Sequence, residues 1–388
     1  MSNQKLKIGI TCYPSLGGSG VVATELGLML AKRGHEIHFI SSSLPFRLNR
    51  LPKNVFFHEV EVSDYYVFRY PPYGLSLASK MASVVKDFSL DLLHVHYTVP
   101  HTTSALLAKQ MVNTNLKVIT TLHGTDITVL AQENSFKDII QYSLMNSDAV
   151  TAVSNDLILQ THRLLGEIIP IERIYNFVDA NDFMPRGAFS RIDFADPHEK
   201  ILIHISNFRP VKRTEDVIDI FSKVNKIIPS KLILIGDGPD LPKVNEKVRI
   251  LALEDKVKFL GKQDQVTELY LIADLLLLPS EKESFGLVAL EAMASGVPTV
   301  GSDTGGIPEV IKHGKTGYLS PIGDVEGMAN QAIQILNTTG LHERFKQAGI
   351  ERARSYFDSG HIVAQYERLY YRVMNPDKQL QKLESEAY

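Results

Sequence analysis

Short apolar runs alternate with longer amphipathic segments along almost the whole chain of 388 residues. Apolar residues at every third or fourth position predict helices, and brief runs rich in valine, isoleucine and leucine predict buried strands. The predicted strands are Leu6–Thr11, Glu36–Ser41, Phe57–Val62, Asp91–His96, Lys117–His123, Ala149–Ser154, Arg173–Tyr175, Ile201–Ser206, Lys231–Gly236, Val257–Gly261, Leu275–Pro279, Thr299–Gly301 and Gly317–Leu319. The predicted helices are Val21–Lys32, Ser76–Phe88, Thr102–Met111, Asn155–Leu165, Lys212–Ile227, Leu241–Leu251, Phe285–Ala294, Val325–Leu336, Leu341–Ser355 and His361–Met374. Apolar strands separated by helices are typical of parallel sheets covered on both faces, so the pattern predicts an α/β fold.

Both periodicities break between Asp179 and Lys200, where proline, glycine and charged residues accumulate. A break of this kind predicts two Rossmann-like domains, residues 1–178 and 179–357. The last predicted helix carries an apolar stripe, which we expect to pack back on the first domain and so to add residues from about 358 to 388 to it. The same stripe would also suit a homo-oligomer interface. Its members are Ile362, Tyr366, Leu369 and Tyr370.

Charge and cysteine content exclude several classes of protein. The 41 basic and 44 acidic side chains give a formal net charge of −3, whereas nucleic-acid binding usually needs a clearly basic surface. The longest dense apolar stretch, Ala273–Pro279, is far too short for a membrane helix. Cys12 is the one cysteine, so an intrachain disulfide and a cysteine metal cluster are excluded. We therefore expect a cytoplasmic protein without nucleic-acid partners or stable membrane association.

A glycine-rich turn, Gly17 to Gly20, follows the first predicted strand and precedes a helix. Backbone N–H groups at such a turn can bind an anionic ligand. Gly18, Gly20 and Ala23 also satisfy a dinucleotide pattern, but the second strand ends in serines rather than in the acid that binds a nicotinamide ribose. A nicotinamide site is therefore disfavoured, and a turn needed only for tight strand–helix packing remains an alternative.

Two cations stand at the equivalent place in the second half. Arg209 and Lys212 directly follow a predicted strand that ends at Ser206, at the edge where doubly wound sheets bind ligands. Arginine can grip a phosphate as a fork and lysine as a point charge, so the pair suits a diphosphate. The alternative is an ordinary solvated helix start.

The segment from Glu283 to Gly296 follows the most apolar predicted strand. It places Glu283 in a loop, Gly286 at the start of a helix and Glu291 two turns further on. A carboxylate among apolar residues is costly to bury unless it accepts hydrogen bonds, and sugar hydroxyls are natural donors. Glu281 lies in the same loop, and a capping carboxylate with a surface glutamate is the alternative.

His123 ends the fifth predicted strand and is followed by glycine, so we expect it to face a ligand cleft. His94 and His96 alternate along the fourth strand and would share one of its faces. None of these histidines shows the helical spacing of a zinc site, which favours a ligand pocket and disfavours a metal.

The combination of these elements resembles the retaining glycosyltransferases of family 4, which have the GT-B architecture of two facing Rossmann-like domains. The resemblance is carried by Gly17-Gly18-Ser19, His123-Gly124, Arg209 with Lys212, Glu283 with Glu291, and Gly305 to Glu309. Further stretches resemble the members of that family that transfer N-acetylglucosamine from UDP-N-acetylglucosamine to the hydroxyl of L-malate, the first step of bacillithiol biosynthesis. These stretches are Thr11–Pro14, Ser43–Arg47, Gln141–Ser154 and His204–Arg209.

The resemblance implies roles for individual residues. The catalytic set would be His123, Glu283, Arg209 and Lys212. The donor would be bound by Gly17, Gly18, Ser206, Asn207, Arg209, Lys212, Glu283, Ser284, Phe285, Gly286, Leu287 and Glu291. The acceptor would be bound by Ser19, Tyr97, Thr121 and Asn207, while Arg47 and Arg69 are better interpreted as surface charges. Front-face attack, with the donor phosphate accepting the proton, would require no cofactor, no metal and no protein nucleophile.

Two other interpretations remain open from the sequence. One is a family 4 glycosyltransferase with another nucleotide-sugar donor or another acceptor. The other is a non-catalytic two-domain sugar-binding protein, for which Glu283 and His123 would not be needed.

Overall fold

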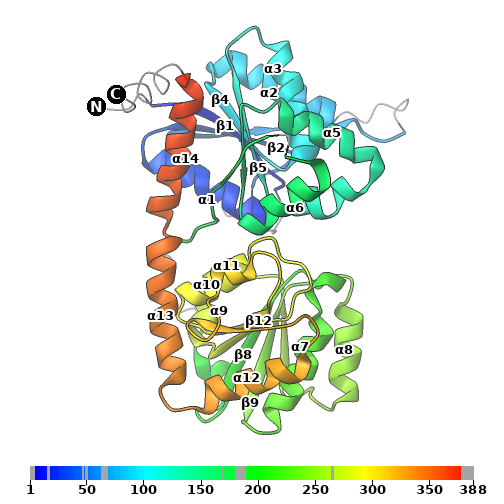
Figure 1. Cartoon of the computed structure of the whole chain (residues 1–388), viewed down its shortest axis with the longest axis vertical. Coiled ribbons are helices and arrows are strands. Elements are labelled where there is room, and N and C mark those ends of the chain that lie inside the picture. The colour runs from blue at the N-terminus through cyan, green and yellow to red at the C-terminus, as the bar shows by residue number, and fades with distance from the viewer. Residues whose placement is uncertain are drawn as a thin grey trace. The chain divides into compact units, whose positions relative to one another are not determined.

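The computed structural model describes residues 5–14, 18–45, 48, 51–62, 69–167, 169–179, 189–263 and 266–376 (Figure 1). The chain divides into two compact units. Unit 1 comprises Met1–Tyr175 and Gly360–Tyr388, and unit 2 comprises Asn176–Ser359. These divisions lie close to the positions that the sequence predicts, after residue 178 and near residue 358.

Unit 1 is built on a seven-stranded parallel sheet in the order β3-β2-β1-β4-β5-β6-β7. Its strands are β1 (Lys7–Thr11), β2 (Glu36–Ser41), β3 (Val55–Glu59), β4 (Leu92–His96), β5 (Lys117–Leu122), β6 (Ala149–Ala152) and β7 (Ile171–Arg173). Its helices are α1 (Gly18–Lys32), α2 (Tyr73–Phe88), α3 (Thr103–Met111), α4 (Thr125–Thr128), α5 (Asn134–Met145), α6 (Asn155–Leu165) and α14 (Ser359–Met374). The five inner strands are almost entirely buried, as expected for a parallel sheet with helices on its faces, while the edge strands β3 and β7 are partly exposed.

Unit 2 is built on a six-stranded parallel sheet in the order β10-β9-β8-β11-β12-β13. Its strands are β8 (Lys200–Ile205), β9 (Ser230–Ile235), β10 (Val257–Gly261), β11 (Leu275–Leu278), β12 (Thr299–Ser302) and β13 (Gly317–Ser320). Its helices are α7 (Thr214–Asn225), α8 (Leu241–Ile250), α9 (Thr267–Ile272), α10 (Leu287–Ala294), α11 (Ile307–Val310), α12 (Val325–Asn337) and α13 (Leu341–Tyr356). The α/β class predicted from the sequence is confirmed.

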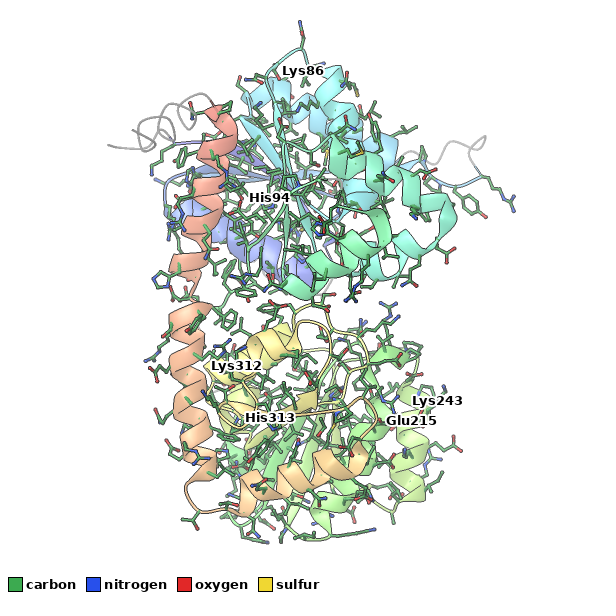
Figure 2. The ribbon with its side chains drawn as sticks, viewed as in Figure 1. Lys86, His94, Glu215, Lys243, Lys312 and His313 are labelled. Atoms are coloured by element: carbon green, nitrogen blue, oxygen red, sulfur yellow. The ribbon has the colours of Figure 1, made fainter. Side chains whose placement is uncertain are left out.

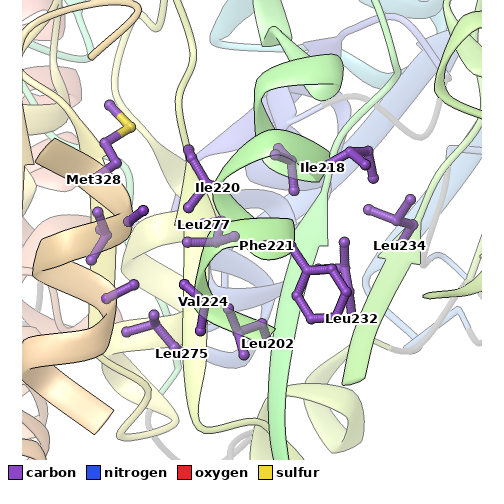
Figure 3. Close-up of a cluster of buried hydrophobic side chains, with 14 of the residues drawn as sticks. Leu202, Ile218, Ile220, Phe221, Val224, Leu232, Leu234, Leu275, Leu277 and Met328 are labelled. Atoms are coloured by element: carbon purple, nitrogen blue, oxygen red, sulfur yellow. The ribbon is translucent and has the colours of Figure 1, made fainter. Parts of the chain in front are cut away.

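The core of unit 2 shows why its strand ends are well positioned (Figure 3). Leucines from three strands, β8, β9 and β11, pack against the inner face of α7 and against Met328 of α12. The members drawn and labelled are Leu202, Ile218, Ile220, Phe221, Val224, Leu232, Leu234, Leu275, Leu277 and Met328. Each buried aliphatic or aromatic side chain stabilises the fold by roughly 1.5–3 kcal/mol, so β8 and β11 are held firmly side by side.

Helix α14, drawn in red, packs on the sheet of unit 1 although it comes from the far end of the chain (Figure 1). The four residues of its predicted apolar stripe are at most 1% exposed. Tyr370 Oη lies 2.7 Å from Nδ1 of His94, and Glu367 pairs with both Arg33 and His35 of the first domain segment. The stripe therefore serves the crossing within the chain and is not available as an oligomer interface.

Sequence patterns predicted all the strands of the two sheets but missed α5 and the short helices. Helix α5 exposes apolar side chains, including Phe136, Tyr142 and Met145, to solvent. Without a consistently polar outer face, its helical period is hard to distinguish.

Each sheet changes the direction of its strand order at one point. In unit 1 the change lies between β1 and β4, and in unit 2 it lies between β8 and β11. Ligands of open α/β sheets bind beyond the carboxyl ends of the strands at such points, because the helices on either side diverge there. No helix among the described residues has the length and apolar character needed to cross a bilayer.

Candidate active site

Three loops of unit 2 meet beyond the carboxyl ends of β8, β11 and β12. The backbone N–H of Glu281 donates to the carbonyl oxygen of Val211 at 2.8 Å, and that of Gly306 donates to the carbonyl oxygen of Glu283 at 2.8 Å. Gly305 has φ +56, and a Cβ there would lie 2.0 Å from the carbonyl oxygen of Glu283. This approach requires glycine, so the Gly305-Gly306 pair noted in the sequence supports the Glu283 loop.

The structure brings Lys212 and Glu283 together. Nζ of Lys212 lies 2.5 Å from Oε2 of Glu283, and each side chain is 19% exposed. Arg209 is exposed, and its guanidinium forms no hydrogen bond or ion pair with any residue in the described part of the chain. Arg213, by contrast, is paired with Asp216. Arg209 is thus a cation available to a ligand, beside a second cation held by a carboxylate.

The turn that carries Arg209 is held in a strained conformation. Phe208 and Arg213 have positive φ angles of 38° and 50°, which residues other than glycine rarely adopt. Nδ1 of His204 donates to the carbonyl oxygen of Leu277 at 2.9 Å, which leaves Nε2 to accept from the hydroxyl of Ser206 at 2.8 Å. Burial lowers the pKa of His204 to about 4, so the ring is neutral.

The hydroxyl of Ser206 is therefore already engaged in a hydrogen bond with His204. Its Oγ also accepts from the backbone N–H of Phe208 at 3.2 Å, so the hydroxyl fixes the turn. Asn207 is exposed beside it, as a donor or acceptor contact requires. A Cβ on Gly238 would lie 2.0 Å from the carbonyl oxygen of Asn207, so the loop after β9 also packs tightly against this turn.

Glu291 lies on α10 and is 9% exposed. Its Oε2 accepts a hydrogen bond of 3.1 Å from the hydroxyl of Tyr270, a fully buried residue that the sequence did not single out. The hydrogen bond explains how a carboxylate is accommodated there. Because Tyr270 lies on α9, 21 positions away in the sequence, no local spacing pointed to it.

Four of the predicted donor-binding residues, 284–287, lie at the start of α10 and differ in how far their side chains are buried. Gly286 has φ +96 and directly precedes Leu287, the first residue of the helix, and Ser284 and Leu287 are half-buried. Phe285 is 2% exposed and packs edge-on against Phe357. The side chain of Phe285 thus belongs to the core, so only its backbone can contribute to donor binding.

The corresponding edge of unit 1 carries a group of aromatic side chains. The ring of Tyr13, after β1, lies 5.4 Å from that of Tyr97, after β4, and 4.5 Å from that of His101. The ring of Tyr97 lies 5.5 Å from that of His123, after β5. The structure therefore joins two predicted residues, Tyr97 and His123, and adds two that were missed. The position of Tyr13 one residue after Cys12, just past the first strand, was the available signal.

Four histidines of this region are buried and neutral. His94 and His96 share a face of β4, as predicted, with ring centroids 4.5 Å apart (Figure 2 labels His94). Burial lowers the pKa of His94 and His123 to about 3 and that of His101 to about 4, and it lowers the pKa of His96 well below its usual range. No three His, Cys, Asp or Glu side chains of the described residues are grouped to hold a metal ion.

Thr121 does not face this edge. It is fully buried, and its hydroxyl lies 2.7 Å from both Nε2 of His94 and Oγ1 of Thr151. Alternation along β5 points it to the face that α14 covers, and a contact of Thr121 with the acceptor stays a prediction. Gly17 lies outside the described residues. Gly18 and Ser19 form the first turn of α1, which begins earlier than predicted, so their backbone N–H groups are free of intrahelical acceptors.

Asp126 is a further residue that the sequence argument missed. It is fully buried, and its Oδ1 accepts from the backbone N–H of Gly124 at 2.9 Å. Burial raises the pKa of Asp126 to about 6. An acid two residues after the His123-Gly124 pair was the signal, and it fixes the turn that presents His123.

Comparison with known proteins identifies the family. Residues 187–352 match the family described as "Glycosyl transferases group 1", and residues 16–182 match the one described as "Glycosyltransferase Family 4". The chain is 54% identical over 376 residues to N-acetyl-alpha-D-glucosaminyl L-malate synthase of Bacillus anthracis, which covers 96% of this chain and 99% of that protein. It is 26% identical to sulfoquinovosyl transferase SQD2 of Arabidopsis thaliana over 74% of this chain and 57% of that protein.

Solved structures share the fold. Sucrose-phosphate synthase of Thermosynechococcus elongatus superposes with a TM-score of 0.80 at 20% identity, over 96% of this chain and 100% of the other. Anabaena HepE in complex with UDP and glucose superposes with a TM-score of 0.79 at 20% identity, over 94% and 99%. The chain therefore belongs to the glycosyltransferases of family 4 and group 1, in the same family as the N-acetyl-alpha-D-glucosaminyl L-malate synthase of Bacillus anthracis.

Proposed function

We propose that this glycosyltransferase transfers N-acetylglucosamine from UDP-N-acetylglucosamine to the hydroxyl of L-malate with retention, as the first step of bacillithiol biosynthesis in the cytoplasm. Identity of 54% along nearly the full length of the synthase from Bacillus anthracis supports these substrates. The observation that carries the proposal in the structure is the contact of Lys212 with Glu283, next to the exposed Arg209.

The charges of this group match those of a nucleotide-sugar donor. A UDP-sugar brings a diphosphate that gains negative charge as the sugar departs, and Arg209 can bind it as a fork while Lys212 contributes a point charge. Glu283, in contact with Lys212, accepts hydrogen bonds from the sugar hydroxyls next to that phosphate. Glu291, held by Tyr270 further along α10, accepts them from the ribose.

In the proposed reaction the bond between the anomeric carbon and the phosphate oxygen breaks, and its electron pair stays with UDP. The malate hydroxyl oxygen bonds to the anomeric carbon from the same face, and its proton passes to the departing phosphate oxygen. The products are UDP and the α-glycoside of malate. Because Glu283 is paired with Lys212, it acts as a hydrogen-bond acceptor and not as a nucleophile.

For the acceptor we propose the aromatic edge of unit 1, beyond β1, β4 and β5. The first-turn N–H groups at Gly18 and Ser19, favoured by the helix dipole, and the hydroxyl of Tyr97 are donors suited to carboxylates. We propose further that the amide of Asn207 binds the donor or the acceptor and that His123 contacts the sugar near its reacting carbon. No cofactor or metal is part of the proposal.

A panel of donors and acceptors tests this function. Purified enzyme with UDP-N-acetylglucosamine and L-malate should release UDP and form a product with the mass of the glycoside. Inositol phosphates, other hydroxy acids and UDP-glucose should give much lower rates. Release of no UDP with malate, or a higher rate with another pair, would contradict the proposed substrates. Tight UDP binding without any turnover would indicate a sugar-binding protein.

A further inference from the structure

Two imidazoles form a hydrogen bond at the carboxyl ends of β4 and β5. Nδ1 of His96 lies 2.8 Å from Nε2 of His123, with the ring planes 29° apart. A hydrogen bond between two ring nitrogens requires a proton on one of them and a lone pair on the other. Because burial lowers the pKa of both residues far below neutral, neither ring is doubly protonated near neutral pH. Two arrangements remain, with the proton supplied by either partner.

The second nitrogen of His96 decides between them. Nε2 of His96 is buried and has no hydrogen-bond partner among the described residues. If Nε2 carried the proton, a buried N–H would be left without an acceptor, which proteins rarely tolerate. If Nδ1 carries it, only a lone pair is left unpaired.

The neighbouring His101 provides a precedent within the same cluster. Its Nδ1 lies 2.5 Å from the carbonyl oxygen of His96, and a carbonyl can only accept, so this Nδ1 carries the proton. The buried Nε2 of His101 is therefore an unprotonated nitrogen, and it too has no partner among the described residues. The fold thus already contains the arrangement that we infer for His96.

We propose that His96 is a positioning residue that sets the tautomer of His123. Nδ1–H of His96 donates to Nε2 of His123, so the proton of His123 resides on its Nδ1. That Nδ1 has no hydrogen-bond partner in the described part of the chain, and His123 keeps 9% of its surface exposed, so we expect a ligand to reach it. His123 therefore presents a neutral N–H donor.

The tautomer has a chemical consequence that rests on the proposed function. An N–H donor can bind an oxygen of the sugar or the acceptor, but it cannot remove the acceptor's proton. This agrees with transfer of that proton to the departing phosphate. His96 itself touches neither substrate and acts only through His123.

Nitrogen NMR of the unmodified full-length protein, labelled with ¹⁵N at its histidine rings, tests the tautomer directly. Protonated and unprotonated ring nitrogens resonate far apart, and the signals are assigned by their loss in His96→Leu and His123→Ala. We expect both rings to be protonated at Nδ1 and unprotonated at Nε2. Protonation of His123 at Nε2 would overturn the proposal, whatever the activity of the enzyme.

A double-mutant cycle tests whether His96 acts through His123. Asn and Leu have nearly the same shape, but only Asn can donate an N–H where Nδ1 lay. His96→Leu should lower kcat roughly tenfold, as expected when one hydrogen bond is lost, and His96→Asn should restore most of it. In the His123→Ala background neither change should lower kcat further. Equal losses in both backgrounds would show an effect on the fold alone and overturn the proposal.

The two arms separate failure of this inference from failure of the proposed function. If His123→Ala retained full kcat, the catalytic role proposed for His123 would be wrong, while the NMR signals would still decide the tautomer. Thermal unfolding of each variant shows how much of any loss comes from stability.

Discussion

The two switch-point edges share one topology but differ in their chemistry. In unit 2 the loops beyond β8 and β11 present an exposed arginine and a lysine–glutamate pair. In unit 1 the loops beyond β1, β4 and β5 present two tyrosines and neutral histidines. Charged side chains thus lie at the edge that we assign to the diphosphate, where negative charge develops during the reaction. Uncharged donors mark the edge that we assign to the acceptor, whose carboxylates keep their charge throughout.

The comparison also shows two ways to hold such an edge. Unit 2 uses close backbone approaches at glycines, such as Gly305 against Glu283, and positive φ angles at Phe208 and Arg213. Unit 1 uses side-chain hydrogen bonds among buried groups, such as those of His96 and Asp126. Substitutions in the two units should therefore affect different measurements.

Loss of the charge of Lys212 should have the largest effect. Lys212→Met should lower kcat by about a hundred- to a thousandfold, as for removal of one transition-state donor, because the departing phosphate loses a cation. Steady-state assays of UDP release measure it. Lys223→Met is the matched control, since Lys223 lies on the exposed side of α7 and pairs with Glu326 of α12. A loss below threefold in Lys212→Met would refute the charge-based role of this edge.

Glu283→Gln should come next. A hydrogen bond to a charged group contributes roughly 1.5–3 kcal/mol, so we expect kcat to fall about 10- to 100-fold. Glu281→Gln should change kcat very little, because the side chain of Glu281 is exposed while its backbone makes the loop contacts. Sequence spacing suggested this choice between the two glutamates, and equal losses in the two variants would contradict it.

Tyr97→Phe should act on the acceptor alone. Loss of one neutral hydroxyl costs about 1 kcal/mol, so the KM for malate should rise roughly fivefold while the KM for the donor stays unchanged. The ring contacts with Tyr13 and His123 are retained in this variant. Tyr142→Phe on exposed α5 is the control. A rise in the donor KM instead would place the donor at this edge.

Acidification should destabilise unit 1 more than unit 2, and this is the smallest of the expected effects for each group involved. The pKa of His94, His96, His101 and His123 is lowered in the fold by burial, so below about pH 6.5 the unfolded chain binds protons that the folded chain does not. Each imidazole should destabilise unit 1 by about 0.7 kcal/mol between pH 7 and pH 6. Asp126, whose pKa is raised to about 6 by burial, partly offsets this as it becomes protonated.

Hydrogen exchange followed by mass spectrometry, corrected for intrinsic rates, measures this difference peptide by peptide. Unit 2 contributes one comparable imidazole, His204, whose pKa burial lowers to about 4. Its slowest amides should therefore lose less protection than those of unit 1. Equal losses in the two units would contradict the neutral histidine cluster.

The sequence predicted the sheets well because buried strands are coded locally. Runs such as Leu275–Leu278 are apolar at every position, which only a strand covered on both faces requires. The E-x7-E spacing and the cations after β8 were visible for a similar reason: they follow directly on strands. Glu283 and Lys212 were predicted as partners in function, and the structure brought their side chains into contact.

Local patterns failed where a side chain's partner lies far away in the chain. Thr121 was predicted to bind the acceptor, and the sequence did not indicate that its hydroxyl lies against His94 and Thr151. Phe285 looked like part of a binding loop, but its ring completes the core against Phe357. Tyr270, Tyr13 and Asp126 escaped notice because their contacts depend on packing rather than on spacing.

The sequence by itself determined the α/β class, the positions of the strands along the chain and the cations and carboxylates that follow them, because periodicity and turn residues act over a few positions. The tertiary structure alone decided which of these side chains are exposed, which are consumed by neighbours and which nitrogen of a buried imidazole carries the proton. Those properties depend on burial and on hydrogen-bond partners brought from distant segments. Arg209 and His123 are both single residues after a strand, and only the fold leaves one charged in solvent and makes the other neutral.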